Sequence, residues 1–306
     1  MSTTSKSPRK VALTALAIGQ RTLPTYAHRF APKTFTQPQL LACLVLMRFY
    51  KTDFRGIVAI LQDNPALCDT LQLKRVPHFT TLHKAYRRLI RMPVVRQLFS
   101  TSAKLLFGRK RTVPRAAADS SGFESSRISP YFVRRRQSGQ KDAKNPLYTT
   151  TTYSHFPKGH IIADCDTHLV LACYPKRGPT PDVAELDVLQ TQLAPGLRLL
   201  TLFADAGYDS ESNHVMLRDY LGIRSIIPPK HGRPSTKPAK GKYRRLMQRQ
   251  FKDVERTGYG QRWQVETVFS MMKRNLGHAV TGRSHHARNR DILLHCITHN
   301  AMILRR

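Results

Sequence analysis

Two apolar segments that each end in an aspartate constrain the fold of this chain most. Residues 113–119 (VPRAAAD) and 198–205 (RLLTLFAD) read as short buried strands, and each is followed within three residues by a glycine. Ligands in open α/β sheets gather at the carboxyl ends of strands. If the two strands are neighbours, Asp119 and Asp205 meet at one end of the sheet. Oxygen-only ligands of this kind suit Mg²⁺ or Mn²⁺. The alternative is that each aspartate is a helix cap or a turn residue.

The rest of the pattern predicts a mixed α/β sheet behind a helical region. Strands that first form a hairpin and then alternate with helices are typical of such a sheet. The expected strands of the hairpin are residues 158–166 and 168–174, and a further strand is expected at 223–227. Helices are expected at residues 37–51, 53–61, 82–92, 93–107, 182–192 and 210–221, and a loop at 228–242. Residues 1–35 contain three prolines and predict a flexible arm with at most a short helix at 11–18.

The charge of the chain indicates its partner. Lysine and arginine total 51 against 19 acidic residues, a formal net charge of +32, which is typical of a protein that binds a polyanion. Acidic proteins and membrane surfaces fit the charge too, but nucleic acid fits it best. The longest apolar run, residues 40–47, is too short to span a membrane, and residues 1–10 lack the apolar core of a secretion signal. Five scattered cysteines without a CxxC pair fit reduced thiols, so we expect a cytoplasmic, nucleoid-associated protein.

One basic helix in the N-terminal part is a candidate for DNA recognition. Residues 76–89 place Lys84, Arg87 and Arg88 on the outer face of a helix whose apolar residues face a core. A short turn followed by such a helix is the arrangement of a DNA-recognition helix. The alternative is a solvated basic helix, and the net charge favours DNA.

A third acid lies among cations near the C-terminus. On a helix, Tyr259, Arg262, Glu266 and Lys273 would share one narrow stripe, because each residue turns the helix by about 100°. The alternative is a row of surface salt bridges. The seven-residue spacing from Glu266 to Lys273 is too long for a good ion pair, however. Cations around one acid would suit a phosphate backbone that passes over a metal site.

Three stretches give the chain its resemblance to a known family. They are residues 118–123 (ADSSGF), residues 203–208 (FADAGY) and residues 259–273 (YGQRWQVETVFSMMK). The last stretch matches the signature Tyr-x2-Arg-x3-Glu-x6-Lys at every position. The chain therefore resembles the DDE transposases of prokaryotic insertion sequences over residues 113–276. The resemblance implies an RNase H-like mixed sheet with flanking helices, preceded by an all-α DNA-binding region.

The resemblance also implies roles for individual residues. Asp119, Asp205 and Glu266 would be the catalytic residues and the ligands of two Mg²⁺ (or Mn²⁺) ions, and Tyr259, Arg262 and Lys273 would contact the transposon end. The reaction would be metal-dependent cleavage at the terminal inverted repeats and strand transfer into target DNA, by a homodimer on double-stranded DNA. A nuclease without strand transfer and an inactive DNA-binding relic are the alternatives.

These interpretations divide the chain into three parts. We expect a basic arm at residues 1–35, a helical DNA-binding domain at 36–110 and the DDE catalytic domain at 111–306. The basic residues of 124–147 are expected to form a DNA-facing loop, and those of 230–249 a solvated loop that touches phosphates.

The remaining candidates receive structural roles. Asp182 is interpreted as a helix cap. His295 and His299 have the i, i+4 spacing of metal ligands but are expected to be satisfied within the protein. Trp263 would pack half-buried, with stacking on a DNA base as the alternative.

Overall fold

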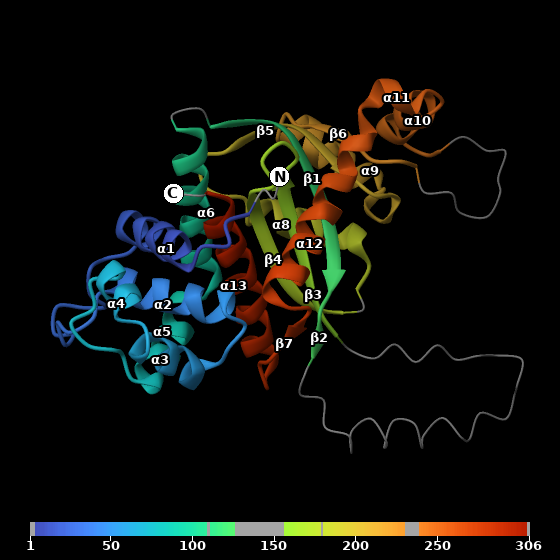
Figure 1. The fold of residues 1–306 in the computed structure, drawn as a ribbon. Helices are drawn as coiled ribbons and strands as arrows, with labels where there is room; N and C mark the ends of the chain where they lie inside the picture. Colours follow the sequence, from blue (N-terminus) through green and yellow to red (C-terminus); the bar gives the residue numbers. More distant parts are fainter. Residues whose placement is uncertain (1–3, 109–110, 126–155, 179, 230–238, 305–306) are drawn as a thin grey trace, which may run out of the picture.

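A five-stranded sheet forms the centre of the molecule (Figure 1). The computed structural model describes residues 4–108, 111–125, 156–178, 180–229 and 239–304. The strand order is β4-β3-β1-β5-β6, where β1 pairs antiparallel with β3 and parallel with β5. This mixed order confirms the RNase H-like sheet that the resemblance implied. The strands are β1 Thr112–Gly122, β3 Phe156–Asp164, β4 Val170–Gly178, β5 Arg198–Ala204 and β6 Arg224–Ile226, and a separate small sheet pairs β2 Glu124–Ser125 with β7 Ala279–Val280.

Helices cover both faces of the sheet, and alternate residues of the strands face the two sides. Ala117 and Phe203 belong to the core that includes Val265 of α12, whereas Ala118 and Leu202 belong to the core on the opposite face. Figure 1 shows α12 and α13 on one side of the sheet and α8 on the other. On the first face lie α12 Trp263–Leu276 and α13 His285–Ile303, and on the second lie α8 Leu186–Thr191, η2 Ala206–Tyr208, α9 Glu211–Val215 and η3 Met216–Tyr220.

The N-terminal part is helical, as expected, with differences at its boundaries. An additional short helix, α4, follows α3, and α5 begins three residues before the expected start because His78 caps it through Nδ1. The helices are α2 Gln37–Phe49, α3 Phe54–Gln62, α4 Pro65–Thr70, α5 Phe79–Leu89 and α6 Met92–Phe107.

Residues 8–22 form a packed helix that is longer than the short helix expected at 11–18, so this part of the expected arm at residues 1–35 is not flexible. Helix α1 spans Pro8–Thr22 and lies against α2. Val11 and Ile18 are buried at helical spacing. Pro8 occupies the first turn, where a missing backbone N–H costs nothing, and the Ser7 hydroxyl caps the helix. The prediction that Pro8 interrupts helical structure was therefore wrong.

Among the described residues, the N-terminal helices and the sheet share one hydrophobic core. The core runs from α1 through α2 and α6 to α13, which is buried along its C-terminal two-thirds. Tyr86 of α5 donates a hydrogen bond to the buried Asp291 carboxylate of α13, with an oxygen–oxygen distance of 2.5 Å. In the described parts of the chain, no helix has the length and apolar character needed to cross a membrane.

Candidate active site

Strand register brings the two predicted aspartates together. Ala118 of β1 lies opposite Ala204 of β5 in the last pair of a parallel ladder, so the next residues, Asp119 and Asp205, are neighbours where β5 ends and three residues before β1 ends. Both side chains point to the face covered by α12, which supplies Glu266 from its first turn. The structure thus brings together all three carboxylates that the sequence singled out.

The guanidinium of Arg262 lies between the three carboxylates. Its Nη2 atom is 3.3 Å from Asp119 Oδ2 and 3.7 Å from Asp205 Oδ2, and its Nη1 atom donates to Glu266. The Arg262 side chain is 18% exposed. Three acids from three separate elements therefore surround one positive centre.

Electrostatic interactions at this centre oppose one another. Burial raises the pKa of Asp119 to about 6, although Arg262 and a hydrogen bond from the Ser120 N–H lower it. Asp205 and Glu266 raise the Asp119 pKa further by repulsion. The neighbouring Arg262 cation therefore favours the ionised form of Asp119 against burial and repulsion.

A glycine keeps Asp205 in place. The Asp205 carboxylate accepts a hydrogen bond from the Gly207 N–H at 2.9 Å and so caps η2. A Cβ at residue 207 would lie only 2.9 Å from Asp205 Oδ1. The glycine that follows the second strand therefore leaves room for the carboxylate next to it.

The donor set fits a hard divalent cation. The three groups offer only carboxylate oxygens, which Mg²⁺ and Mn²⁺ prefer. Within the described residues, no three carboxylate, imidazole or thiol groups are placed to hold a metal ion as they stand. Arg262 instead pairs with all three acids. Asp119, Asp205 and Glu266 would hold a metal ion in place of that guanidinium.

The signature residues do not share one continuous α-helix, which corrects the single-helix expectation. Tyr259 and Arg262 belong to the 3₁₀ turn η4 Tyr259–Arg262, and α12 begins only at Trp263. Gly258, at φ 71°, precedes the turn in the left-handed region. From the end of this turn the Arg262 side chain reaches Asp119 and Asp205 at the sheet.

The other two signature residues lie around the site. Lys273 Nζ donates to Ser121 Oγ at 2.7 Å, beside the end of β1. The Tyr259 ring is half-buried against Phe251, with ring centroids 5.1 Å apart. Neither side chain contacts a triad carboxylate directly in the described structure. Their roles in DNA binding, and that of Arg262, stay predictions.

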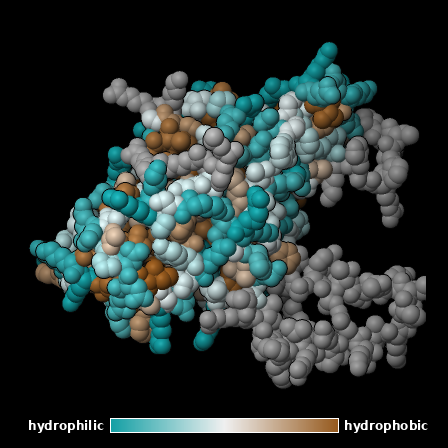
Figure 2. Space-filling view, in the orientation of Figure 1, coloured by the Kyte–Doolittle hydropathy of each residue, from teal (hydrophilic) through white to brown (hydrophobic). Residues whose placement is uncertain are grey.

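Trp263 is more exposed than expected. Its side chain follows Arg262 directly and the residue is 59% exposed, so it does not pack half-buried. Figure 2 shows that hydrophilic side chains predominate along α12 on this face. An exposed aromatic side chain therefore follows Arg262 in the sequence, and the alternative of stacking on a base stays a prediction.

The candidate recognition helix presents two of its three cations. Lys84 and Arg87 of α5 are exposed. Arg88 instead donates from Nη2 to Gln37 Oε1 of α2 at 2.7 Å, and burial lowers its pKa. Arg88 therefore faces a neighbouring helix, whereas Lys84 and Arg87 remain candidates for contact with DNA.

A polar cluster behind Asp119 was not predicted as a group. Asp182 Oδ1 accepts from Lys158 Nζ at 2.6 Å and from Ser120 Oγ at 3.0 Å. His160 is buried 3.6 Å from the same oxygen, and burial lowers its pKa to about 4. Asp182 therefore holds the end of β1 in place through Ser120, on the face of the sheet opposite to Asp119. Strand alternation gave the only signal, because Lys158 and His160 lie two residues apart on β3.

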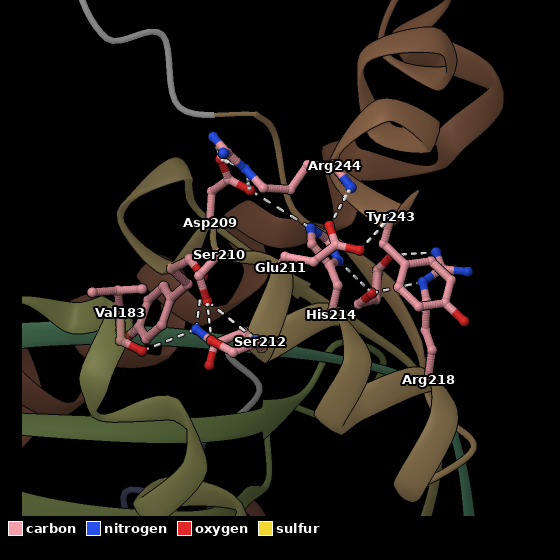
Figure 3. A network of polar contacts seen from close by, with 12 residues as sticks. Val183, Asp209, Ser210, Glu211, Ser212, His214, Arg218, Tyr243 and Arg244 are labelled. Carbon is pink, nitrogen blue, oxygen red and sulfur yellow. Dashed lines mark hydrogen bonds and ion pairs between the residues drawn. The ribbon is translucent and has the colours of Figure 1, made fainter. Parts of the chain in front are cut away.

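Part of the basic segment between the second and third acids is a helix rather than a solvated loop. Helix α10 Lys242–Gln250 is held against α9 by the network in Figure 3, and the short helix α11 Val254–Thr257 follows it. The Glu211 carboxylate accepts hydrogen bonds from the backbone N–H groups of Tyr243 and Arg244 at 2.9 and 3.0 Å. The Arg244 side chain donates hydrogen bonds from Nε and Nη2 to the buried Asp209 carboxylate. Residues 230–238 of this segment, and 126–147 of the other basic loop, lie outside the described residues.

His295 makes its polar contacts within the protein, as expected, whereas His299 does so through Nε2 alone and its buried Nδ1 has no partner among the described residues. His295 Nδ1 lies 2.7 Å from the Asp291 carbonyl oxygen, and His299 Nε2 lies 2.9 Å from the His168 carbonyl oxygen. Burial lowers the pKa of both imidazoles to about 4, so both are neutral.

Comparison with known proteins identifies the family. No curated protein matches the chain. One similar solved structure is a crystal structure of a pre-cleavage Mos1 transpososome, which is 10% identical in sequence. The match covers 87% of this chain and 95% of that chain. Its TM-score of 0.22 is too low for a comparison of folds. The model of the transposase DDE domain matches residues 117–301. This match covers more than half of the sequence and includes all three carboxylates, so the chain belongs to the transposase DDE domain family.

Proposed function

We propose that this protein binds the terminal inverted repeats of an insertion sequence, cleaves DNA there and transfers the freed strand to target DNA. The observation that carries the proposal is the convergence of Asp119, Asp205 and Glu266 on one cationic centre. Such a centre at the carboxyl ends of two parallel strands is suited to phosphoryl transfer. The net charge of +32 supports DNA as the substrate.

The cofactor of the proposed reaction is a pair of Mg²⁺ or Mn²⁺ ions held by the three carboxylates. When bound, such ions supply an activated water and stabilise the leaving oxygen. The role of the carboxylates is to hold this charge in a fixed place. The hydrogen bond from Ser120 to Asp182 holds the strand next to Asp119 in position for that role. The Gly207 N–H does the same for Asp205.

The protein's cations bind and orient the DNA in this proposal. Lys273 and Tyr259 flank the carboxylates from α12 and η4, and exposed Lys84 and Arg87 extend the basic surface to α5. Phosphate contacts fix register and orientation, and catalysis of in-line phosphoryl transfer depends mainly on such positioning. We propose that two copies act together on two ends, within the nucleoid of the cell.

A cleavage and joining assay tests the proposal. The substrate is labelled duplex DNA that carries the terminal repeats and their flanks, with Mg²⁺ or Mn²⁺ and a target duplex. Asp205→Asn should abolish cleavage at the repeat tip and joining while DNA binding persists. The matched control, Asp187→Asn, removes the same charge from exposed α8 on the other face of the sheet and should retain both activities.

Each alternative gives a different result in the same assay. Cleavage without joined products would establish a nuclease that lacks strand transfer. DNA binding without cleavage by the wild-type protein, in either metal, would establish an inactive relic and overturn the proposal.

A further inference from the structure

A basic pocket lies outside the carboxylate site, where the start of α6, the end of β4 and the first turns of α13 meet. Its volume is about 480 Å³. Six of its lining residues are cationic or can become so, and no carboxylate is among the described residues that line it. We call it the α13 pocket; these six residues are Arg91, Lys176, Arg177, His285, His286 and Arg290.

Most of this charge has no acidic partner in the part of the chain that the structure describes. Lys176 is paired with the buried Glu185 at 2.5 Å. In contrast, Arg91, Arg177 and Arg290 make no ion pair with any carboxylate in the described parts of the chain. The Nε–H of Arg290 is buried and donates no hydrogen bond. Three guanidinium groups therefore meet at one pocket without a counter-ion among the described residues.

The histidines of the pocket respond to this excess of positive charge. The pKa of His285 is lowered by burial first, and then by repulsion from His286 and Arg177. The rings of His285 and His286 lie 5.9 Å apart. An anion in the pocket would relieve this repulsion and would accept hydrogen bonds from arginine.

The pocket lies at the same end of the sheet as the candidate active site. Arg177 on β4 is opposite Pro157 on β3, and Lys158 on β3 is opposite Gly122, which ends β1 three residues after Asp119. Strands β4 and β1 flank β3, so they are about 10 Å apart. A DNA duplex carries one charge per roughly 1.7 Å of its axis, so a duplex at the carboxylates would bring further phosphates within reach of the pocket.

We propose that the α13 pocket binds a phosphate group of the DNA backbone, away from the phosphate that reacts. Arginine suits this ligand because its planar donors match two phosphate oxygens at once. Only the choice of DNA as the source of the phosphate rests on the proposed function. The pocket would then fix the path of the duplex beside the carboxylates.

The test is the salt dependence of DNA binding in EDTA, where no cleavage occurs. The binding constant of a labelled duplex is measured by fluorescence anisotropy over a range of salt concentrations, for wild type, Arg177→Ala and Arg177→Lys. Loss of one phosphate contact should weaken binding and reduce the slope of log K against log salt by about 0.9. Arg177→Lys keeps the charge and should retain most of the slope.

Arg198→Ala is the matched control, because Arg198 is exposed at the start of β5, at the opposite end of the same sheet. It should leave affinity and slope unchanged. Equal slopes for wild type and Arg177→Ala would overturn the proposal. Because Arg177 is exposed, the variant is expected to fold, and circular dichroism checks this.

A second arm distinguishes DNA from a free anion. Inorganic phosphate is titrated while the melting temperature is measured. Stabilisation of wild type but not of Arg177→Ala, together with unchanged DNA binding by the variant, would show a small-anion site and overturn the DNA assignment. Neither arm depends on catalysis, so failure of the cleavage assay and failure of this proposal are separate results.

Discussion

Replacing Arg262 by alanine should lower the free energy of unfolding of the metal-free protein. It should make the free energy of metal binding more favourable by the same amount. The guanidinium lies 3.3 Å from Asp119 and 3.7 Å from Asp205. Unit charges at 3.3 Å attract by about 5 kcal/mol at an effective dielectric constant of about 20. Desolvation of the partly buried arginine offsets much of this attraction, which leaves a net stabilisation of about 2 kcal/mol, typical of hydrogen bonds to charged groups.

The equality follows from a thermodynamic cycle. A metal ion held by the carboxylates takes the place of Arg262 as the shared cation, so the metal-bound protein has no contact left to lose. The variant therefore loses about 2 kcal/mol of stability only without metal, and its affinity for Mn²⁺ should rise about 30-fold.

Two measurements made in the absence of DNA check the cycle. Urea unfolding in EDTA gives the free energy of unfolding, and calorimetric titration with Mn²⁺ gives the metal affinity. The fluorescence of Trp263, the one tryptophan in the sequence and the neighbour of Arg262, reports directly on the same site. Arg274→Ala is the matched control, because it removes an exposed arginine from the last turn of the same helix and should change neither quantity.

A loss of stability in Arg262→Ala without tighter binding of Mn²⁺ would refute this prediction. That result would mean that the arginine and the metal ion do not compete for the carboxylates. Unchanged stability and unchanged affinity would show that the guanidinium does not join the three acids in solution.

Three further predictions concern stability. Asp209→Ala should lower the free energy of unfolding, measured by urea titration, by about 3 kcal/mol, because a buried ion pair loses one partner. Asp253→Ala, from an exposed pair, should lower it by under about 1 kcal/mol in the same assay. Tyr86→Phe should cost about 1–3 kcal/mol while unfolding stays one transition by fluorescence and circular dichroism; two separate transitions would contradict the shared core. Burial lowers the pKa of His295 and His299 to about 4, so the unfolded chain binds more protons below pH 6.5 and stability falls on acidification. The loss should be about 2 kcal/mol per histidine by pH 5, and a flat stability profile in urea titrations across pH would contradict it.

The sheet and the meeting of its two aspartates could be predicted because both depend on local patterns. Apolar runs mark β1 and β5, and parallel pairing of those strands suffices to place Asp119 beside Asp205. The same local reasoning failed at Pro8, because proline fits the first turn of a helix as well as it breaks one. Which role it takes depends on whether the apolar residues after it find a partner, and here α2 provides one.

The position of Arg262 could not be predicted from its spacing. A helical projection places Arg262 on the stripe with Glu266 but assumes one continuous α-helix. The residue instead ends a 3₁₀ turn, and its direction depends on acids from β1 and β5, which are distant in the sequence. A contact among three elements has no periodic signal, and for the same reason the Asp182 cluster behind β1 was not foreseen.

The shared core has a consequence for how binding energy is used. Tyr86 and Asp291, which join α5 to α13, are 205 residues apart, so no local pattern revealed that the helical part and the sheet pack as one body. If DNA binds the exposed cations of α5, its position relative to the carboxylates is then fixed by packing rather than by a linker. Binding energy gained on the helices is thereby available to hold the reacting phosphate in line, which is where positioning lowers the barrier to phosphoryl transfer.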